Sequence, residues 1–432
     1  MRRSLLGDAT LAFVLKLSGT IVLFSLSIYI SREMGADAFG MFSLFLSILL
    51  PLSVLARMGL DNNLLRLVSR LLVHKPKAEV SVLYKQSFKA VLYCSAGISL
   101  LILLVDVVSS RLSINAKATD LFPWLAIALP FHALLMLNAY YLRGKHWVVR
   151  SSLYENVLVF LFTLVFLLTF QKLITEHLST SALLFGIILT SLVSFFAINK
   201  SLNDGSELID ELPDIKERFK EALPMMGTSL ATIAFVTLDV FLLSFFVDFS
   251  ELGIYAAAAK LVGFVGFPLM AIIAMAGPRL SEADAKGDVL LLKKVYRDTS
   301  RLVVWSGVPI FIVLLFVPDL LLGFFGEGFS KATTVVYILL AGQAFNLAMG
   351  PIGYLLWMSG RALELQKATL VSLVVLVLLS LLLMPLMGME GAAIAVSSAL
   401  MVKGVGCWWL VRKWLGFDPM YIPGKRSSDV SD

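Results

Sequence analysis

The chain has 432 residues, of which 59% are hydrophobic and only 15% are charged, and its mean hydropathy is +0.88. Soluble globular proteins carry about 25% charged residues, so the composition excludes that class and predicts an integral membrane protein. The placement of the charges matters more here than their formal net value of +6. Both cysteines, Cys94 and Cys407, lie in apolar segments and predict no disulfide framework.

Apolar segments long enough to cross a bilayer recur along the whole chain. A membrane helix needs about 20 apolar residues to cover a hydrocarbon core of about 30 Å. Twelve spans are predicted, at about 9–30, 40–60, 88–109, 120–142, 151–171, 180–199, 222–246, 252–278, 302–323, 332–357, 368–387 and 390–411. The first is too long for the apolar region of a cleaved signal peptide and has no small-residue cleavage site, so we expect it to be retained.

Most of the 36 Lys and Arg residues fall in alternate loops between these spans. The loops on the other side hold only Arg32, Arg111, Lys117, Lys172 and Lys331. Because Lys and Arg accumulate in cytoplasmic loops, both termini are predicted to lie in the cytoplasm. The predicted external loops are all short, including the one at 31–39 between the first two spans, so no external domain is expected.

Short matches between the two halves predict an internal repeat. Gly40-Met41-Phe42-Ser43 corresponds to Gly253-Ile254-Tyr255-Ala256, 213 residues later, and Arg143-Gly144-Lys145 corresponds to Ser359-Gly360-Arg361, 216 residues later. Six spans per half is an even number, so the two halves have the same orientation in the membrane. Such a parallel repeat is related by an axis along the membrane normal, as in one class of secondary transporter.

The predicted fold is therefore an all-α integral membrane protein with twelve transmembrane helices in two six-helix lobes. The expected parts are an N-terminal lobe at 1–200, a cytoplasmic linker at 201–221, a C-terminal lobe at 222–411 and a cytoplasmic tail at 412–432. The linker is acidic at first and then of mixed charge, which indicates a solvated tether.

Four cations lie inside the predicted spans: Lys16, Arg57, Lys260 and Lys403. A charge at mid-bilayer costs about 2.5 to 3.5 kcal/mol on insertion scales, so these side chains are expected to face protein or water. Lys260 lies roughly 12 Å deep at 1.5 Å per residue, too deep for easy snorkelling, and is the strongest candidate for a functional role. Arg57 and Lys16 are open to either a functional or a structural role, whereas snorkelling or a structural role better explains Lys403. The acid Asp239, in the seventh span, has Lys260 or a proton as its expected partner, so proton coupling and a structural ion pair both remain open.

Motifs for several enzymatic chemistries are missing from the sequence. Gly144-Lys145 is followed by His146, so it does not complete a phosphate-binding loop, and there is no Gly-x-Ser-x-Gly elbow. The four histidines lack metal-ligand spacing. We therefore expect no enzymatic activity, no cofactor, no metal and no ATP motor in this chain.

Several short motifs at helix ends carry a resemblance to a known family. They are Ser31-Arg32-Glu33-Met34-Gly35, Phe39-Gly40-Met41-Phe42, Arg57-Met58-Gly59-Leu60-Asp61-Asn62, Leu65-Arg66-Leu67-Val68-Ser69, Leu142-Arg143-Gly144-Lys145 and Gly388-Met389-Glu390-Gly391-Ala392-Ala393-Ile394-Ala395. With them, the chain resembles the polysaccharide flippases of the O-antigen type, within the multidrug/oligosaccharidyl-lipid/polysaccharide exporter superfamily. The resemblance extends over essentially the whole chain, but these motifs specify the superfamily fold better than the cargo.

The resemblance implies two lobes around a central cavity lined largely by spans one, two, seven and eight. It also implies that cations in this cavity bind a lipid-linked glycan through its phosphate or pyrophosphate. Lys260, Arg57 and Lys16 lie on those spans and are the predicted substrate-binding residues, with Asp239 a candidate for coupling or for an ion pair. A fixed cation in a desolvated cavity attracts phosphate more strongly than it would in water.

The expected function is that of a flippase in the bacterial cytoplasmic (inner) membrane. It would translocate an undecaprenyl-pyrophosphate-linked oligosaccharide from the cytoplasmic to the external leaflet, by alternating access of the two lobes, for assembly of O-antigen or exopolysaccharide. Expected partners are this lipid-linked oligosaccharide, membrane lipids, and a polysaccharide polymerase with its chain-length machinery, and no nucleic acid.

Two alternative functions remain open from the sequence. An ion-coupled drug or metabolite antiporter of the same fold would favour acidic cavity residues for cationic cargo. A membrane-embedded glycan polymerase or ligase would be an enzyme and would carry a large external loop, which is not predicted here.

Overall fold

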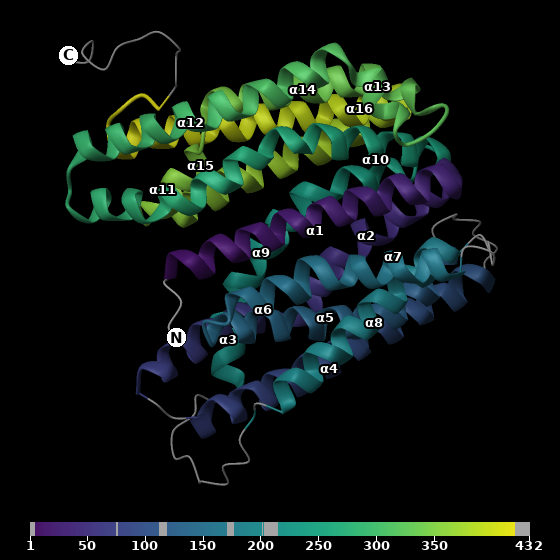
Figure 1. Cartoon of the computed structure of the whole chain (residues 1–432), viewed down its shortest axis with the longest axis horizontal. Helices are drawn as coiled ribbons and strands as arrows, with labels where there is room; N and C mark the ends of the chain where they lie inside the picture. The colour runs from purple at the N-terminus through teal and green to yellow at the C-terminus, as the bar shows by residue number, and fades with distance from the viewer. Residues whose placement is uncertain are drawn as a thin grey trace. The chain divides into compact units, whose positions relative to one another are not determined.

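The computed structural model describes residues 5–74, 77–111, 119–170, 177–200, 202 and 215–419, and every regular element within these ranges is helical (Figure 1). Most of the predicted linker, at 203–214, and the end of the predicted tail, from residue 420, lie outside the described residues. Residues 215–221, which the sequence assigned to the linker, form the start of a long helix.

The chain divides into two compact units, which are described separately here. Unit 1 comprises Met1–Ser244 and Asp248–Gly253, and unit 2 comprises Phe245–Val247 and Ile254–Asp432. The helices of unit 1 are α1 (Leu5–Glu33), α2 (Gly35–Arg57), α3 (Leu60–His74), α4 (Lys77–Arg111), η1 (Thr119–Leu121), α5 (Phe122–Gly144), α6 (Val148–Ser152), the π-helical η2 (Leu153–Leu158), α7 (Val159–Phe170), α8 (Leu178–Asn199) and α9 (Ile215–Leu243). After α10 (Phe249–Gly263), which begins in unit 1, unit 2 contains η3 (Phe264–Gly266), α11 (Phe267–Ala285), α12 (Val289–Phe316), α13 (Pro318–Gly323), η4 (Phe329–Ala332), α14 (Thr333–Met349), α15 (Ile352–Met358) and α16 (Ala362–Leu415). Unit 1 thus includes the seventh span, while the lobe boundaries drawn from the sequence remain a prediction.

Among the described residues, eleven helical segments are long and apolar enough to cross a membrane, and the last of them is double. α16 has 54 residues, or about 80 Å at 1.5 Å per residue, which is far more than one bilayer. Its helical geometry breaks at Gly388, where φ is 54° and ψ is −126°. A Cβ built on Gly391 would stand 2.4 Å from the carbonyl oxygen of Leu383, so the chain folds back at this point. The eleventh and twelfth spans meet here, and the predicted count of twelve is confirmed.

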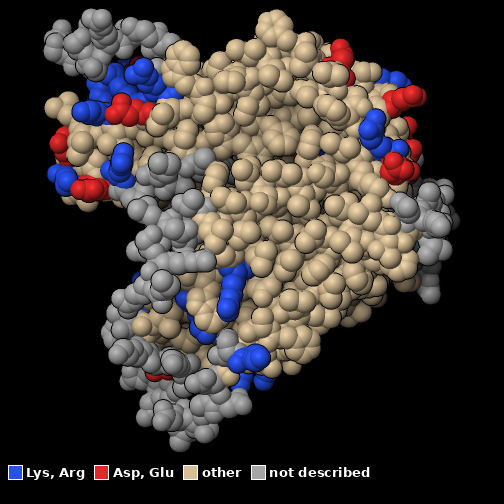
Figure 2. Space-filling model, viewed as in Figure 1, with Lys and Arg blue, Asp and Glu red and all other residues tan. Residues whose placement is uncertain are grey.

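The surface between the helix ends is apolar. Leu100, Leu382 and Phe316 are 59%, 61% and 75% exposed, which water would penalise and lipid would not. On the face drawn in Figure 2, charged side chains gather mainly toward the ends of helices, and the area between them is almost free of charge. The chain is a multi-pass membrane protein.

α5 forms the centre of unit 1, where it packs against α2, α3, α4 and α8. Polar side chains join these helices inside the apolar interior. The Tyr84 hydroxyl donates to Asn138 Oδ1 at 2.7 Å, and Asn138 Nδ2 donates to Ser194 Oγ at 2.9 Å. One asparagine on α5 therefore ties α4 to α8. Interhelical hydrogen bonds of this kind contribute about 0.6 kcal/mol each in membrane proteins.

The glycines matched in the internal repeat contact each other's helices. A Cβ on Gly40 would lie 1.9 Å from Phe249 O, and a Cβ on Gly253 would lie 2.1 Å from Ala36 O. Both pairs, 36 with 249 and 40 with 253, differ by the same 213 residues that separate the sequence motifs. Small residues let membrane helices approach this closely, and the contact is reciprocal, as a two-fold-related repeat requires.

The predicted nine-residue loop at 31–39 is wrong. α1 continues to Glu33 and α2 begins at Gly35, so only Met34 separates the two helices. Gly35 has a φ of 90°, which a glycine adopts without the steric cost that a side chain would bring. The polar residues that suggested a loop lie instead in the end turns of the two helices.

Prolines mark the helix breaks in unit 2. The eighth span bends through η3 just before Pro268, and the tenth is interrupted at Gly350 and Pro351. α14 ends at Met349, and the last carbonyls of a helix have no intrahelical donor, so a carbonyl at this end needs another partner. The Tyr296 hydroxyl on α12 donates to this oxygen, Met349 O, at 2.6 Å. Tyr296 and Met349 belong to the apolar core that α11, α12, α14, α15 and α16 form together.

Candidate functional site

A tight turn between α2 and α3 positions the candidate site in unit 1. α2 ends at Arg57, and the next two residues, Met58 and Gly59, have positive φ values of 49° and 75°. A Cβ on Gly59 would lie 2.1 Å from the carbonyl oxygen of Ala222 on α9, so a glycine is needed where α9 crosses the turn. The chain then continues as α3, which lies between the predicted second and third spans.

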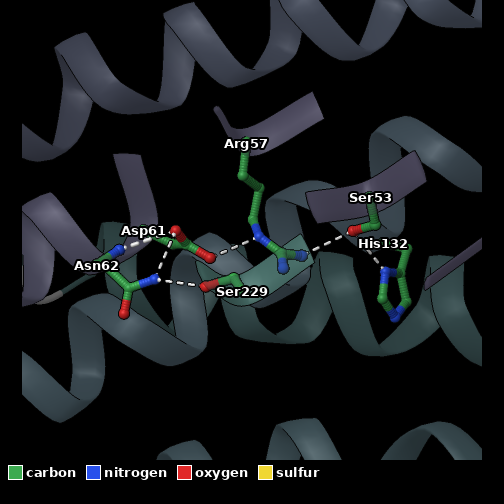
Figure 3. Close-up of polar contacts among 6 residues, drawn as sticks. All are labelled: Ser53, Arg57, Asp61, Asn62, His132 and Ser229. Atoms are coloured by element: carbon green, nitrogen blue, oxygen red, sulfur yellow. Dashed lines mark hydrogen bonds and ion pairs between the residues drawn. The ribbon is translucent and has the colours of Figure 1, made fainter. Parts of the chain in front are cut away.

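Arg57 is buried in a polar cluster at this turn (Figure 3). Its Nε lies 2.7 Å from Asp61 Oδ2, and the two side chains are only 7% and 3% exposed. Its Nη1 donates to Ser53 Oγ at 2.7 Å, one turn back along α2. Ser53 Oγ also lies 2.8 Å from His132 Nδ1 on α5. Ser53 therefore links the guanidinium of α2 to the imidazole on α5.

Asp61 connects the same cluster to α9. Its Oδ1 accepts from the backbone N–H of Asn62 at 2.8 Å, and the Asn62 side-chain amide donates to Ser229 Oγ at 3.2 Å. The cluster defined by Ser53, Arg57, Asp61, Asn62, His132 and Ser229 therefore draws on α2, α3, α5 and α9 (Figure 3). We call it the Arg57 cluster.

The Arg57 cluster brings together a cation and its counterion away from water. Removing one partner of a buried ion pair typically costs 3 to 5 kcal/mol, because the other charge stays buried without compensation. A guanidinium has five N–H donors, and Asp61 and Ser53 use only two of them. The geometry therefore holds a fixed, planar cation whose remaining donors suit the oxygens of a phosphate.

A second polar cluster lies where α9 meets α3 and α4. Arg218, which is 1% exposed, donates to Asn63 Oδ1 at 3.2 Å, to Gln86 Oε1 at 3.3 Å and to Ser87 Oγ at 2.5 Å. Asn63 in turn donates to Glu221, which also pairs with Arg66. A buried arginine surrounded by amide and hydroxyl partners anchors the start of α9 to the rest of unit 1.

The other predicted site residues, and Lys403, are not members of the Arg57 cluster. Lys16 is exposed on α1, and Asp239 is 7% exposed on α9, both in unit 1. Lys260 is half-buried on the part of α10 that belongs to unit 2, and Lys403 is half-buried on α16. For Arg57 the structure supplies a defined set of polar partners, and the cargo-binding roles of all these cations remain predictions.

The sequence reading missed most of what surrounds Arg57. Ser53, Arg57 and Asp61 follow one another at intervals of four residues, so their helical spacing was a usable signal. Ser229 lies 167 residues from Asn62 in the chain, and Arg218 lies 131 to 155 residues from its partners in the second cluster. No local pattern connects residues at that distance.

A comparison with protein families decides the classification. The model of the polysaccharide biosynthesis protein family matches residues 5–284, which is more than half of the chain. The chain belongs to this family. The match runs through every helix of unit 1 and into α11, so the Arg57 cluster lies wholly within the family region.

Individual relatives of this polysaccharide biosynthesis protein agree with the family match. The chain is 24% identical, over 87% of its length and 77% of the relative's, to the "Probable low-salt glycan biosynthesis flippase Agl15" of Haloferax volcanii. Its fold is similar to an inward-facing multidrug resistance MATE family transporter of the MOP superfamily, with a TM-score of 0.75 and 14% identity over 94% of this chain and 98% of the other. It is also similar to the lipid II flippase MurJ in an inward closed conformation, with a TM-score of 0.71 and 15% identity over 94% and 87%. These similarities show that the chain shares the fold of these two structures.

Proposed function

We propose that this protein is a flippase that moves a lipid-linked oligosaccharide, attached to undecaprenyl pyrophosphate, from the cytoplasmic to the external leaflet of the bacterial inner membrane. The observation that carries the proposal is the family match over residues 5–284 together with a glycan flippase relative that aligns with 87% of the chain. The glycan would then serve surface polysaccharide assembly, as O-antigen or exopolysaccharide. A polymerase and chain-length machinery would be its downstream partners.

In the proposed mechanism, the two lobes alternate access to a cavity between spans one, two, seven and eight. Lys260, Arg57 and Lys16 provide positive charge for the pyrophosphate, and Asp239 acts in coupling or in an ion pair. Asp61 and Ser53 hold the Arg57 guanidinium in one orientation, so cargo oxygens would meet donors that are already fixed in place. Preorganised donors of this kind bind without the entropic cost of ordering a long side chain.

The proposed topology places both chain termini in the cytoplasm. Its support is the charge pattern of the loops, in which Lys and Arg concentrate on the side that the N-terminus occupies. With no phosphate-binding loop in the sequence, the drive would be an ion gradient or consumption of the product outside.

A test in cells replaces Lys260 and Arg57 singly by Ala and measures both surface polysaccharide and the amount of protein in the membrane. Lys403→Ala is the matched control, because Lys403 is also half-buried in a span but lies outside the four spans expected to line the cavity. We expect polysaccharide to fall in both variants and to persist in the control. Unchanged polysaccharide in both variants would refute the cationic cavity.

Because Arg57→Ala leaves Asp61 buried without its partner, a loss of folded protein must be separated from a loss of cargo binding. The double variant Arg57→Ala/Asp61→Ala removes both charges and is expected to restore the protein level without restoring transport. If the double variant restores both, Arg57 has only a structural role.

A drug or metabolite antiporter is the second candidate function. The specific observation that favours it is Asp239, a carboxyl group only 7% exposed within the seventh span, which suits a cationic cargo or a coupling ion. If the protein is an antiporter, the wild type transports a cationic dye and Asp239→Asn abolishes that transport. If it is a flippase, the wild type does not transport the dye.

A further inference from the structure

The end of α16 carries a group of cations stacked on tryptophan rings. It consists of Arg361, Trp408, Trp409, Arg412, Lys413 and Trp414. We call it the α16-end cluster, and all of it lies in unit 2. The family match ends at residue 284, so the cluster lies beyond the matched region.

The contacts within the cluster are specific. Arg361 lies 5.0 Å from the centre of the Trp414 ring and also donates to the Trp414 carbonyl oxygen at 3.3 Å. Lys413 Nζ lies 4.8 Å from the Trp409 ring and 5.5 Å from the Trp414 ring. A cation over an indole face gains about 0.5 to 1 kcal/mol at an exposed site and keeps its outer donors available.

Charge at this helix end is unbalanced. Among the described residues, none of Arg361, Arg412 and Lys413 forms a salt bridge with a carboxylate. The neighbouring Asp418 accepts a hydrogen bond from Trp408 Nε1 at 3.0 Å. On the face drawn in Figure 2, Lys and Arg gather near the ends of α12 and α16, with some acidic side chains among them.

The tryptophans of the cluster face outward. Trp409 and Trp414 are 54% and 46% exposed, although an indole ring is costly to leave in water. In membrane proteins tryptophan concentrates at the level of the lipid headgroups, where its apolar body and its N–H both find suitable surroundings. The cluster lies at the end of a helix long and apolar enough to cross a membrane, so we expect its rings at that level.

The internal repeat places a similar arrangement in unit 1. Lys145 corresponds to Arg361 by the 216-residue offset, and its Nζ lies 4.9 Å from the Trp147 ring, over which Arg150 also stacks at 4.7 Å. A cation on a tryptophan thus occurs at the same point of each half, just after the fourth and the tenth span.

We propose that the α16-end cluster binds the anionic headgroup of a phospholipid in the leaflet on its side of the membrane. The headgroup phosphate would accept charge-assisted hydrogen bonds from the two arginines and Lys413, while the indoles pack against the glycerol region. Basic pockets beside transmembrane helices bind anionic lipids in this way. An anchored lipid would fix the ends of the tenth and twelfth spans relative to the bilayer.

The test titrates phosphatidylglycerol, with phosphatidylcholine as the neutral comparator, against the purified full chain in neutral detergent, and counts bound lipid by native mass spectrometry. We expect tighter binding of phosphatidylglycerol, weakened by salt. Lys413→Gln should lower its affinity about fivefold, and the triple variant Arg361→Gln/Arg412→Gln/Lys413→Gln roughly a hundredfold, since each cation near an anionic surface contributes about equally. The matched control is Lys286→Gln, since Lys286 is exposed on the same type of helix end but paired with Glu282, and it should leave the affinity unchanged.

Lys413 is exposed, so its replacement is not expected to affect folding, and the melting temperature of each variant checks this. Equal affinity of the wild-type chain for the two lipids would overturn the proposal, as would an unchanged preference in Lys413→Gln. A short-chain polyprenyl pyrophosphate provides a third arm. If the triple variant loses this ligand but keeps its preference for phosphatidylglycerol, the cluster contacts cargo and the lipid proposal is wrong.

Discussion

The ion pair between Arg57 and Asp61 gives the sharpest prediction for stability. Asp61→Asn removes the negative charge and leaves a guanidinium whose side chain is only 7% exposed. Because the uncompensated charge stays buried, we expect a loss of 3 to 5 kcal/mol in the free energy of unfolding. Arg57→Met should cost a similar amount, since it leaves the carboxylate alone.

The double variant Arg57→Met/Asp61→Leu replaces the pair by apolar groups of similar volume. We expect its stability to be close to that of the wild type, because exchanging a buried pair for well-packed apolar residues is often neutral. The single variants Arg57→Met and Asp61→Leu each leave one charge buried, at about 3 to 5 kcal/mol. The double-mutant cycle should therefore give a coupling energy of about 6 to 10 kcal/mol, larger than the 0.5 to 3 kcal/mol usual for residues in contact.

The assay is equilibrium unfolding of the purified chain in detergent, followed by circular dichroism. The control is Glu364→Gln, which breaks the pair with Lys367, whose side chains are 27% and 70% exposed, and should change stability by less than about 1 kcal/mol. Additive effects of Arg57→Met and Asp61→Leu in the cycle would refute the argument, because they would mean that the two charges do not compensate each other in the membrane.

Three further predictions concern backbone geometry and helix breaks. Gly40→Ala should lower the free energy of unfolding by about 1 to 3 kcal/mol, because the added Cβ forces α2 away from the start of α10. Gly97→Ala is the control, since nothing lies within 4 Å of a Cβ at that position, and thermal melts in detergent should show no loss of stability. Tyr296→Phe should lower the free energy of unfolding by about 1 to 3 kcal/mol, because it leaves the carbonyl at the end of α14 unpaired. The control is Tyr337→Phe, at a residue that is 43% exposed. Equal melting temperatures of Tyr296→Phe and the wild type would contradict this role of Tyr296. Gly388→Ala should cost about 1 to 3 kcal/mol, since its φ of 54° with ψ of −126° strains a residue with a side chain, and a stable, fully active variant would argue against the sharp turn.

Composition and span counting predict most of this fold because bilayer thickness sets the length of every helix. Even the boundary between the last two spans could be predicted, because Gly388 stands between two apolar runs. In the structure the two helices are joined there without a loop. The turn between α1 and α2 could not be predicted from the sequence. A single glycine, Gly35, lets α1 and α2 follow each other almost directly, and polar end residues such as Arg32 and Asp37 look like a loop when only their hydropathy is considered.

The candidate site was only partly predictable. Arg57 stood out because a cation inside an apolar span is costly, and Asp61 follows at a helical spacing. Ser229 and Arg218 became visible only in the structure, because their partners come from distant segments of the chain. Gly40 and Gly253 were partly predictable, because the internal repeat identified both residues but did not predict that their helices touch there.

The most direct test of the proposed function is flipping in a purified system. The chain is reconstituted into liposomes that contain an undecaprenyl-pyrophosphate-linked oligosaccharide with a labelled sugar, and a membrane-impermeant reagent reports how much of the label is exposed outside. We expect exposure to increase with the wild-type protein and to remain at the protein-free level with Lys260→Ala. If the wild-type chain leaves the oligosaccharide on its original side while it transports a cationic dye, the flippase proposal is contradicted and the antiporter is favoured.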